Sequence, residues 1–141
     1  MTKFPLVIMT PTEVVFEGEC EILTFRTPEG WMGVLAHRAP LITLLEVDEI
    51  KINTGGGQQE YLLVHGGLLQ CDGERVVILT GEVEKPEEVD VDAARKAMEE
   101  AQKALSMVES TKDRARAEAE LQKATARYRL ALRRTRRIGG R

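Results

Sequence analysis

The chain has 141 residues, of which 43% are hydrophobic and 30% charged, and its formal net charge is −3 at pH 7. This composition excludes the fibrous, intrinsically disordered and disulfide-rich classes, and it predicts one ordinary globular domain or two small ones. No run of eighteen apolar residues occurs, and the opening segment, interrupted by Pro5 and Pro11, fits neither a signal peptide nor a membrane span. The expected compartment is therefore the cytoplasm.

The first part of the chain, up to about Thr80, has the pattern of an all-β domain. Short apolar or alternating runs are separated by glycine-bearing turns, which is typical of an antiparallel sandwich or barrel. The runs are PLVIM, CEILTF, WMGVL, EIKIN, YLLVHGGLLQ and RVVILT. Residues 53–59 (NTGGGQQ) predict one hairpin turn, and Asp72-Gly73 predicts a two-residue hairpin turn with positive φ at both positions.

An acidic stretch around Pro86 ends the β pattern, and beyond it glycine and proline are absent until Gly139. Apolar residues then recur at intervals of three and four, which predicts two amphipathic helices. The two apolar stripes are Val91, Ala94, Met98, Ala101, Leu105 and Val108, and Ala117, Leu121, Ala124, Tyr128 and Ala131. Ser110 with Asp113 approximates a capping box, so a tight turn should join the helices in an antiparallel pair.

The sequence thus predicts an α+β fold. Residues 1–86 should form an N-terminal antiparallel β-sandwich, and residues 87–141 a C-terminal antiparallel two-helix hairpin. Half of the helical stripe positions are alanine, which contributes on the order of 0.8 kcal/mol on burial against roughly 1.5 to 3 kcal/mol for leucine or methionine. A hairpin that packs on the sandwich through such a stripe could detach when a partner binds it. Any short antiparallel helix pair, however, has a similarly weak packing interface.

The end of the chain is strongly basic. Residues 123–141 contain eight Lys or Arg and no acid, and removing that +8 from the total of −3 leaves −11 on the first 122 residues. Such a tail suits an acidic partner. A nucleic acid would be a second candidate, but Tyr128 is the one aromatic residue available for stacking and the acidic remainder would repel a polyanion. A purely solvated helix face also remains open.

Catalytic and metal-binding patterns are weak. Cys20, Cys71, His37 and His65 lack the spacing of a zinc site, and both cysteines are expected to be reduced and buried. The glycines at 55–57 are followed by Gln-Gln rather than Gly-Lys-Ser/Thr, so they do not form a phosphate-binding loop. The sequence therefore predicts no enzyme, no catalytic residue and no metal site.

Three segments carry a resemblance to a known family. Residues 27–45 (TPEGWMGVLAHRAPLITLL) and residues 66–84 (GGLLQCDGERVVILTGEVE) resemble the two signatures of the epsilon subunit of F-type ATP synthase, and residues 87–105 resemble the opening of its first C-terminal helix. The resemblance covers nearly the whole chain in the expected order. It implies a β-sandwich followed by a helical hairpin.

The resemblance also implies a function. The chain would be a non-catalytic rotor subunit of the central stalk, whose sandwich binds the gamma subunit and the c-ring, so that proton-driven rotation reaches the catalytic alpha and beta subunits. Its hairpin would permit turnover when folded down and inhibit ATP hydrolysis when extended into the catalytic head. The expected location is the cytoplasmic face of a bacterial inner membrane, as a peripheral protein.

Two sets of residues are the expected contact sites under this resemblance. Trp31 and Arg38 replace residues that the family usually has as an acid and a histidine, so Trp31 either contacts the rotor ring or folds back onto the sandwich. The expected ring-contact loop consists of Glu29, Trp31, His37 and Arg38. The expected inhibitory contacts to acidic loops of the beta subunits are Arg127, Arg129, Arg133, Arg134, Arg136 and Arg137.

Some bacterial family members bind regulatory ATP through an Ile/Leu-Asp-x-x-Arg-Ala motif. One register places Val89-Asp90 on this motif but has Ala93 where the arginine belongs. The other uses Asp92 with Arg95, but it needs a two-residue insertion. Asp90 is equally explained as a helix N-cap, so no cofactor is expected.

Overall fold

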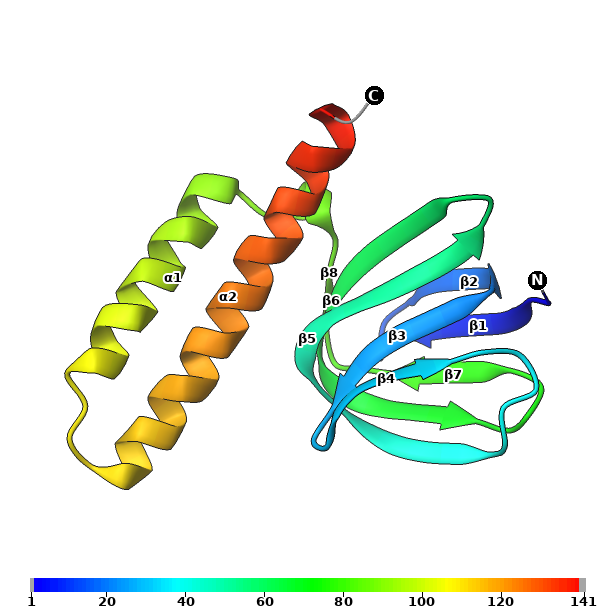
Figure 1. Ribbon diagram of the computed structural model, residues 1–141, viewed down its shortest axis with the longest axis horizontal. Helices are drawn as coiled ribbons and strands as arrows, with labels where there is room; N and C mark the ends of the chain where they lie inside the picture. The colour runs from blue at the N-terminus through cyan, green and yellow to red at the C-terminus, as the bar shows by residue number, and fades with distance from the viewer. Residues whose placement is uncertain (1, 140–141) are drawn as a thin grey trace. The chain divides into compact units, whose positions relative to one another are not determined.

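The computed structural model describes residues 2–139, and the side chains of residues 134–139 lie outside that description. The chain divides into two compact units, Met1–Glu84 and Lys85–Arg141. The first unit consists of β-strands and the second of helices, as Figure 1 shows. The predicted fold, a β-sandwich followed by a helical hairpin, is confirmed.

Eight strands build the first unit. They are β1 (Phe4–Met9), β2 (Val14–Cys20), β3 (Ile22–Thr27), β4 (Gly30–Val34), β5 (Leu41–Gly55), β6 (Gln58–Cys71), β7 (Val76–Leu79) and β8 (Val83–Glu84). The sequence pattern missed β2, because its segment VVFEGEC carries two glutamates and a glycine and turns only its last residue fully into the core. It also missed β8, which has only two residues.

The strands follow the order β2-β1-β7-β6-β5-β3-β4, and β8 pairs with β6. All pairs are antiparallel except β1 with β7, which is parallel. The long strands β5 and β6 run through both layers of the sandwich. Residues 68–71 of β6 pair with β7, whereas residues 63–64 pair with β8. The strands β2, β1 and β7 thus join one half of the long hairpin, and β8, β3 and β4 join the other half.

Strand β6 changes the face that it turns to the core halfway along its length. Leu62 and Val64 belong to the core cluster on one side of the change, and Leu69 and Cys71 on the other, so the positions that face the sandwich core shift from even to odd numbers. Between them Gly66 and Gly67 have φ of 78° and 123°. A Cβ added to Gly67 would lie 2.2 Å from the Leu79 carbonyl oxygen, which only glycine avoids.

The core of the sandwich is apolar and continuous between the two layers. Alternating positions on β1 and β3, with both halves of β5 and β6, supply most of it, as expected for strands that are half buried. Its buried members are Phe4, Leu6, Ile8, Cys20, Leu23, Phe25, Val34, Leu45, Ile50, Ile52, Leu62, Val64, Leu69, Cys71, Val76 and Ile78. Both cysteines are free and buried, as predicted.

The two predicted hairpin turns differ in outcome. Gly56 and Gly57 both have positive φ between β5 and β6, as the NTGGGQQ segment predicted. The prediction for Asp72-Gly73 was one residue too early, because Gly73 alone has positive φ and the Asp72 N–H donates to the Arg75 carbonyl at 3.3 Å. The Asp72 carboxylate accepts from the N–H groups of Glu74 and Arg75, and this keeps Asp72 at the base of the turn.

The second unit contains a short 3-10 helix, η1 (Pro86–Glu88), and two α-helices, α1 (Val91–Ser106) and α2 (Thr111–Gly139). Figure 1 shows the two α-helices running antiparallel. The Asp90 carboxylate caps α1 by accepting from the Ala93 N–H at 2.9 Å. The Ser110 hydroxyl caps α2 by accepting from the Asp113 N–H at 3.1 Å. Both predicted helix starts are therefore confirmed.

The predicted apolar stripes lie on the less exposed sides of the helices. Ala94 and Ala131 are buried, and the other stripe residues are half-buried. Ala126 and Leu130 of α2 are also fully buried, although they fall outside the stripe that the sequence pattern predicted. In the described part of the chain, no helix has the length and hydropathy needed to cross a membrane.

The Gly66-Gly67 break generates a stability prediction. Replacing Gly67 by Ala should lower the free energy of unfolding by about 2 to 4 kcal/mol, because the new methyl group collides with the Leu79 carbonyl and the residue is held at positive φ. Urea denaturation measures the change. Gly81→Ala is the matched control, since its Cβ would meet no atom within 4 Å and should change stability little. Equal stability of the two variants would refute the requirement for glycine at position 67.

The division into two units generates a second prediction. A chain that ends after Glu88 lacks α1 and α2 but keeps all eight strands and the sandwich core. It should fold and unfold cooperatively, because a unit with its own core can fold alone. Thermal unfolding followed by circular dichroism checks this. A broad transition without cooperativity would contradict it.

Candidate functional site

One layer of the sandwich carries an apolar surface on the side away from the core. A continuous row crosses five strands, because Leu44 lies opposite Leu68, Leu68 opposite Leu79, Leu79 beside Met9 and Met9 opposite Val14. Residues opposite one another in a sheet point to the same face. We call this surface the outer apolar face. It consists of this row and the apolar members of the neighbouring row, which also contains Gln70 and Glu17, and it comprises Val7, Met9, Val14, Ile42, Leu44, Leu68, Val77 and Leu79.

The outer apolar face is open to solvent to an unusual degree. Ile42 is 66% exposed, Leu44 61%, Val14 53% and Leu79 44%. A hollow of about 340 Å³ beside it is lined by Met9, Thr10, Pro11, Gly67, Leu79, Thr80 and Gly81. Contiguous exposed apolar side chains mark an interaction surface in soluble proteins. The apolar runs Leu41–Leu45 and Leu68–Leu69 are visible in the sequence. Only the strand register shows that their outward residues lie on one face.

The four residues of the expected ring-contact loop lie at two places. Glu29 lies in the β3–β4 turn and Trp31 is the second residue of β4, whereas His37 and Arg38 follow the end of that strand. All four are exposed. Trp31 lies inside β4, which ends at Val34, whereas His37 lies in the turn beyond that end. The residues therefore form two groups along the edge strand β4 rather than one loop.

Trp31 does not fold back onto the sandwich. Its side chain is 53% exposed, and it lies opposite Arg26 on the outermost strand of the sheet. An indole left this open offers a large apolar contact area. The interpretation that Trp31 folds back onto the sandwich is therefore wrong, and its contact with the rotor ring stays a prediction.

His37 and Arg38 lie in a strained loop beside the β6–β7 turn. His37 has φ of 64°, a left-handed conformation that costs energy for a residue with a Cβ. The loop borders a small cavity together with Gly73, Glu74 and Arg75 of the turn. The second group therefore includes a neighbouring turn, whose charged side chains the sequence did not connect with His37.

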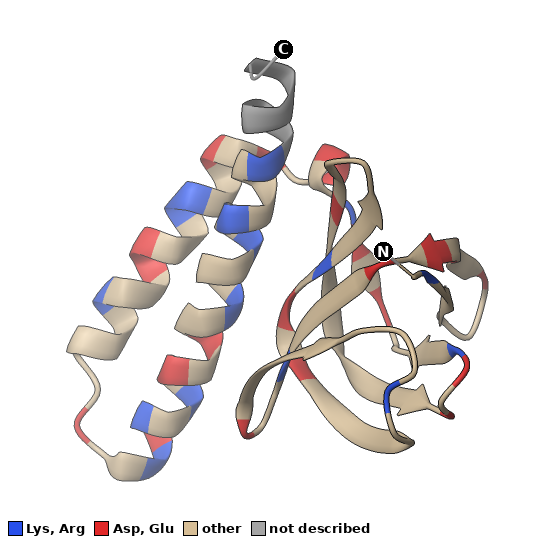
Figure 2. Cartoon of the chain, turned by 45° about the vertical axis from the view of Figure 1, so that its right-hand side comes forward, with Lys and Arg blue, Asp and Glu red and all other residues tan. Residues whose placement is uncertain are grey.

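The basic end of α2 is described only in part. Arg129 is exposed, and Arg127 and Arg133 are half-buried. Each of these three has an interaction within the chain. The side chains of Arg134, Arg136 and Arg137 lie outside the described residues. Figure 2 shows that the acidic residues of α2 lie in its first part, with Lys and Arg continuing beyond them.

The start of α1 contains the acidic residues of both possible registers of the ATP-binding motif, Asp90 and Asp92. Asp90 caps the helix through the Ala93 N–H. Arg95 lies 3.7 Å from the Asp92 carboxylate, one turn earlier on the same exposed helix face. The acidic residue of each register thus has a local structural partner.

The buried acid Asp48 is structural. Its carboxylate accepts from the Arg26 Nε–H at 2.8 Å and from the Glu49 N–H at 2.7 Å. The ion pair and the backbone donor offset the cost of burying the charge. Cys20 is similarly unreactive, since burial raises the pKa of its thiol to about 11 and keeps it protonated.

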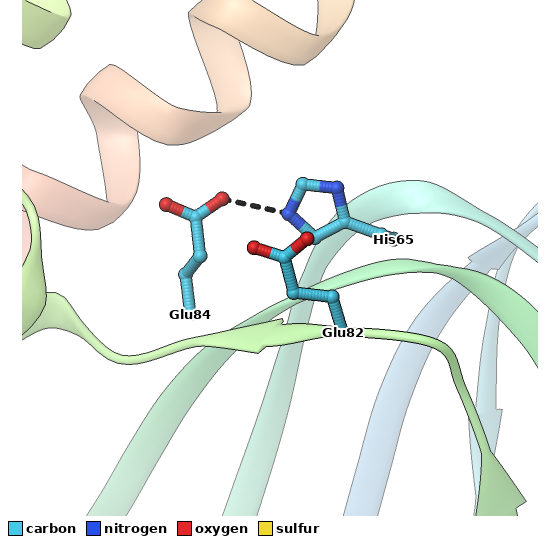
Figure 3. Close-up of side chains that lie close together, drawn as sticks. All are labelled: His65, Glu82 and Glu84. Atoms are coloured by element: carbon cyan, nitrogen blue, oxygen red, sulfur yellow. Dashed lines mark hydrogen bonds and ion pairs between the residues drawn. The ribbon is translucent and has the colours of Figure 1, made fainter. Parts of the chain in front are cut away.

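His65 has two acidic neighbours that lie far from it in the sequence. Its Nε2 lies 2.7 Å from a carboxylate oxygen of Glu84, and Glu82 lies on the same side, as Figure 3 shows. One ligand atom from each of the three residues lies within 4.8 Å of the others. The other residues weighed with His65 as a zinc site, which were His37, Cys20 and Cys71, are not part of this group. The pairing of β6 with β8 brings His65 and the two glutamates together, and no spacing in the sequence indicates it.

The two units match two domain models of one protein family, in the same order along the chain. Residues 3–86 match the family model described as "ATP synthase, Delta/Epsilon chain, beta-sandwich domain", and residues 87–131 match "ATP synthase, Delta/Epsilon chain, long alpha-helix domain". The chain belongs to the ATP synthase delta/epsilon chain family. As a delta/epsilon chain, it is an accessory subunit of ATP synthase and not a catalytic one.

Curated relatives carry the epsilon name. The chain is 36% identical over 131 residues to "ATP synthase epsilon chain, sodium ion specific" of Propionigenium modestum, covering 93% of this chain and 95% of that one. It is 37% identical over 131 residues to the epsilon chain of Moorella thermoacetica, covering 93% and 98%. These similarities favour the ATP synthase subunit over an adaptor that binds nucleic acid.

Solved structures agree with the fold. A chain in the mitochondrial ATP synthase of Euglena gracilis, in a structure of OSCP, F1 and the c-ring, superposes with a TM-score of 0.76 at 26% identity, covering 89% of this chain and 79% of that one. A chain from the central stalk and c-ring structure of the Tetrahymena thermophila mitochondrial ATP synthase superposes with a TM-score of 0.62 at 16% identity. The second similarity supports the delta/epsilon fold alone.

Proposed function

We propose that this chain is the rotor subunit of the central stalk that couples rotation of the c-ring to ATP synthesis and restrains ATP hydrolysis. The observation that carries the proposal is the outer apolar face on a sandwich that belongs to the delta/epsilon family. A subunit that transmits torque needs a permanent partner, and permanent interfaces are apolar. The chain offers such a surface.

The outer apolar face is the proposed binding surface for the gamma subunit. Its central row runs across β5, β6, β7, β1 and β2, so a partner could lie along the row and contact every strand of that layer. Ile42 and Leu44 are its most exposed members and would gain most from being covered. Burying apolar surface contributes roughly 25 cal/mol per Å².

The two groups on strand β4 are the proposed contacts to the c-ring. Trp31 with Glu29 supplies an aromatic and an anionic contact at one end. His37 and Arg38 supply polar and cationic contacts at the other end. Aromatic and arginine side chains are the residues that most often dominate the binding energy of an interface. Contact with the ring would place the protein at the cytoplasmic face of a bacterial inner membrane.

The helical hairpin is the proposed inhibitory element. When extended toward the alpha and beta subunits, the arginines of α2 would pair with carboxylates of the catalytic head, and this would hold the rotor against hydrolytic rotation. The residues proposed for this pairing are Arg127, Arg129, Arg133, Arg134, Arg136 and Arg137. Arginine suits it because its planar guanidinium can bind a carboxylate through two hydrogen bonds.

The gamma-binding proposal is tested on the outer apolar face. The double variant Ile42→Asp, Leu44→Asp should weaken binding of purified gamma subunit at least about tenfold, because two charges would be buried without partners. Both side chains are more than half exposed, so the isolated chain should stay folded. Isothermal titration calorimetry measures the affinity.

Met107→Asp is the matched control for this test. Met107 is 80% exposed and lies between α1 and α2, outside the outer apolar face, so a new charge there should leave gamma binding unchanged. Undiminished binding by the folded double variant would refute this gamma-binding surface. Loss of binding in both variants would also refute it, since the effect would then not depend on the face.

The inhibitory proposal is tested on the tail. Replacing the six arginines by Ala should raise ATP hydrolysis by the assembled enzyme roughly two- to tenfold, since exposed ion pairs contribute only about 0 to 1 kcal/mol each but act together. Alanine favours the helix at least as well as arginine does, so helicity should persist. A coupled-enzyme ATPase assay measures the rate.

Two further variants sharpen the result. The six-lysine version should inhibit partly, because it keeps the charge without the two-pronged hydrogen bonding. Since Arg127, Arg129 and Arg133 also interact within the chain, subunit composition must be checked by gel for each variant. If the six-alanine enzyme hydrolyses ATP at the parental rate while deletion of the hairpin accelerates it, the tail plays no part in inhibition.

A further inference from the structure

We propose that His65, Glu82 and Glu84 form a binding site for a divalent transition-metal ion, Zn²⁺ in the first place. This site is separate from the outer apolar face and from the groups on β4. It is the one group of at least three potential His, Cys, Asp or Glu ligands found among the residues that the structure describes. The proposal does not depend on the function of the subunit.

The backbone ladder fixes the three side chains on one face. The His65 N–H donates to the Glu82 carbonyl at 3.1 Å, and the next pairs along β6 and β8 are Val64 with Val83 and Leu63 with Glu84. Opposite residues share a face, and residues two apart on a strand share it as well. Glu82 and Glu84 therefore both point to the side of His65.

The intervening residue confirms this alternation. Val83 packs against the sandwich core, so the glutamates on either side of it point away from the core. Strand pairing and core packing thus place His65 and Glu84, and the hydrogen bond from the His65 N–H to the Glu82 carbonyl places the exposed Glu82 just before β8. Because strands hold ligands more rigidly than loops do, His65 and Glu84 are the better-fixed pair of the three.

The distances suit a small cation. Zn²⁺ bound at about 2.0 to 2.2 Å from each ligand atom would separate tetrahedral ligands by about 3.3 to 3.5 Å. His65 Nε2 and the Glu84 oxygen lie 2.7 Å apart in their hydrogen bond, and all three ligand atoms lie within 4.8 Å of one another. Small side-chain rotations would open the hydrogen bond and bring Glu82 in.

The chemistry of the three ligands selects the metal. An imidazole nitrogen with two carboxylates suits Zn²⁺ and its first-row neighbours, whereas Mg²⁺ and Ca²⁺ prefer sites made of oxygen alone. The two carboxylates would neutralise the charge of the dication. Three protein ligands leave the fourth position of a tetrahedral Zn²⁺ to water.

Competing ligands on the same chain are poorly placed. The side chains of residues 20 and 71 are buried thiols, and burial raises the pKa of Cys20 to about 11. His37 lies after β4 and is not a member of the group. A metal that binds this chain through histidine with high affinity should therefore bind at His65.

A bound ion would also stabilise the end of the sandwich. Strand β8 has two residues and only two pairs with β6, and Glu84 is the last residue of the first unit. An ion held by both strands would tie β8 to β6 beyond these few backbone contacts. Because it binds the folded state, it should raise the melting temperature.

The test is a titration of the full chain, freed of any histidine tag, with ZnCl₂ in competition with a chromophoric chelator. We expect one Zn²⁺ per chain, a higher Tm with Zn²⁺, and at least tenfold weaker binding by His65→Asn and by Glu84→Gln. With CoCl₂ as a second probe, the visible absorption of four-coordinate Co²⁺ should appear in the parent chain and disappear in His65→Asn.

Two control variants match these changes elsewhere on the sandwich. His37→Asn alters the other histidine and Glu74→Gln an exposed glutamate on the β6–β7 turn, and both should bind Zn²⁺ as the parent does. Should His65→Asn fail to fold, Glu82→Gln serves instead, because Glu82 is exposed and its change should still weaken binding several-fold. The site is refuted if excess Zn²⁺ neither binds nor raises the Tm, or if the ligand variants His65→Asn, Glu82→Gln and Glu84→Gln bind it as tightly as the parent.

Discussion

The sandwich depends on a backbone conformation at Gly66 and Gly67 that only glycine adopts easily. Both have positive φ, and the Gly67 Cα lies so close to the Leu79 carbonyl that no side chain fits. Because the break moves the core-facing positions of β6 from even to odd, one long strand can contribute to both layers of the core. A regular strand would turn one half of these apolar residues to solvent.

The same break determines what the two layers present on their outer sides. After it, Leu68 points outward and joins the row formed with Leu44 and Leu79, which gives an apolar surface suited to a permanent partner. Before it, His65 points outward beside two glutamates of the β8 segment, which gives a polar group suited to a cation. The two candidate sites therefore have different chemistry although they lie on one strand.

Local signals in the sequence predicted most of the fold. The caps at Asp90 and Ser110, and the paired glycines 56–57, act within a few residues of the chain, so their effect can be read without a tertiary structure. The turn after β6 was placed one residue early, because the Asp72 carboxylate prefers to accept from the following N–H groups. The segment of β2 was missed because few of its side chains reach the core.

The sequence by itself determined the class of fold, the two-part organisation and the family, because periodicity, turn residues and motifs are properties of neighbouring residues. Only the tertiary structure decided which distant residues share a surface. His65 meets Glu84 across nineteen positions through strand pairing, and Ile42 and Leu44 join Val14 through four neighbouring ladders. Strand register determines which of these residues become neighbours, and register depends on the packing of the whole core rather than on any short segment.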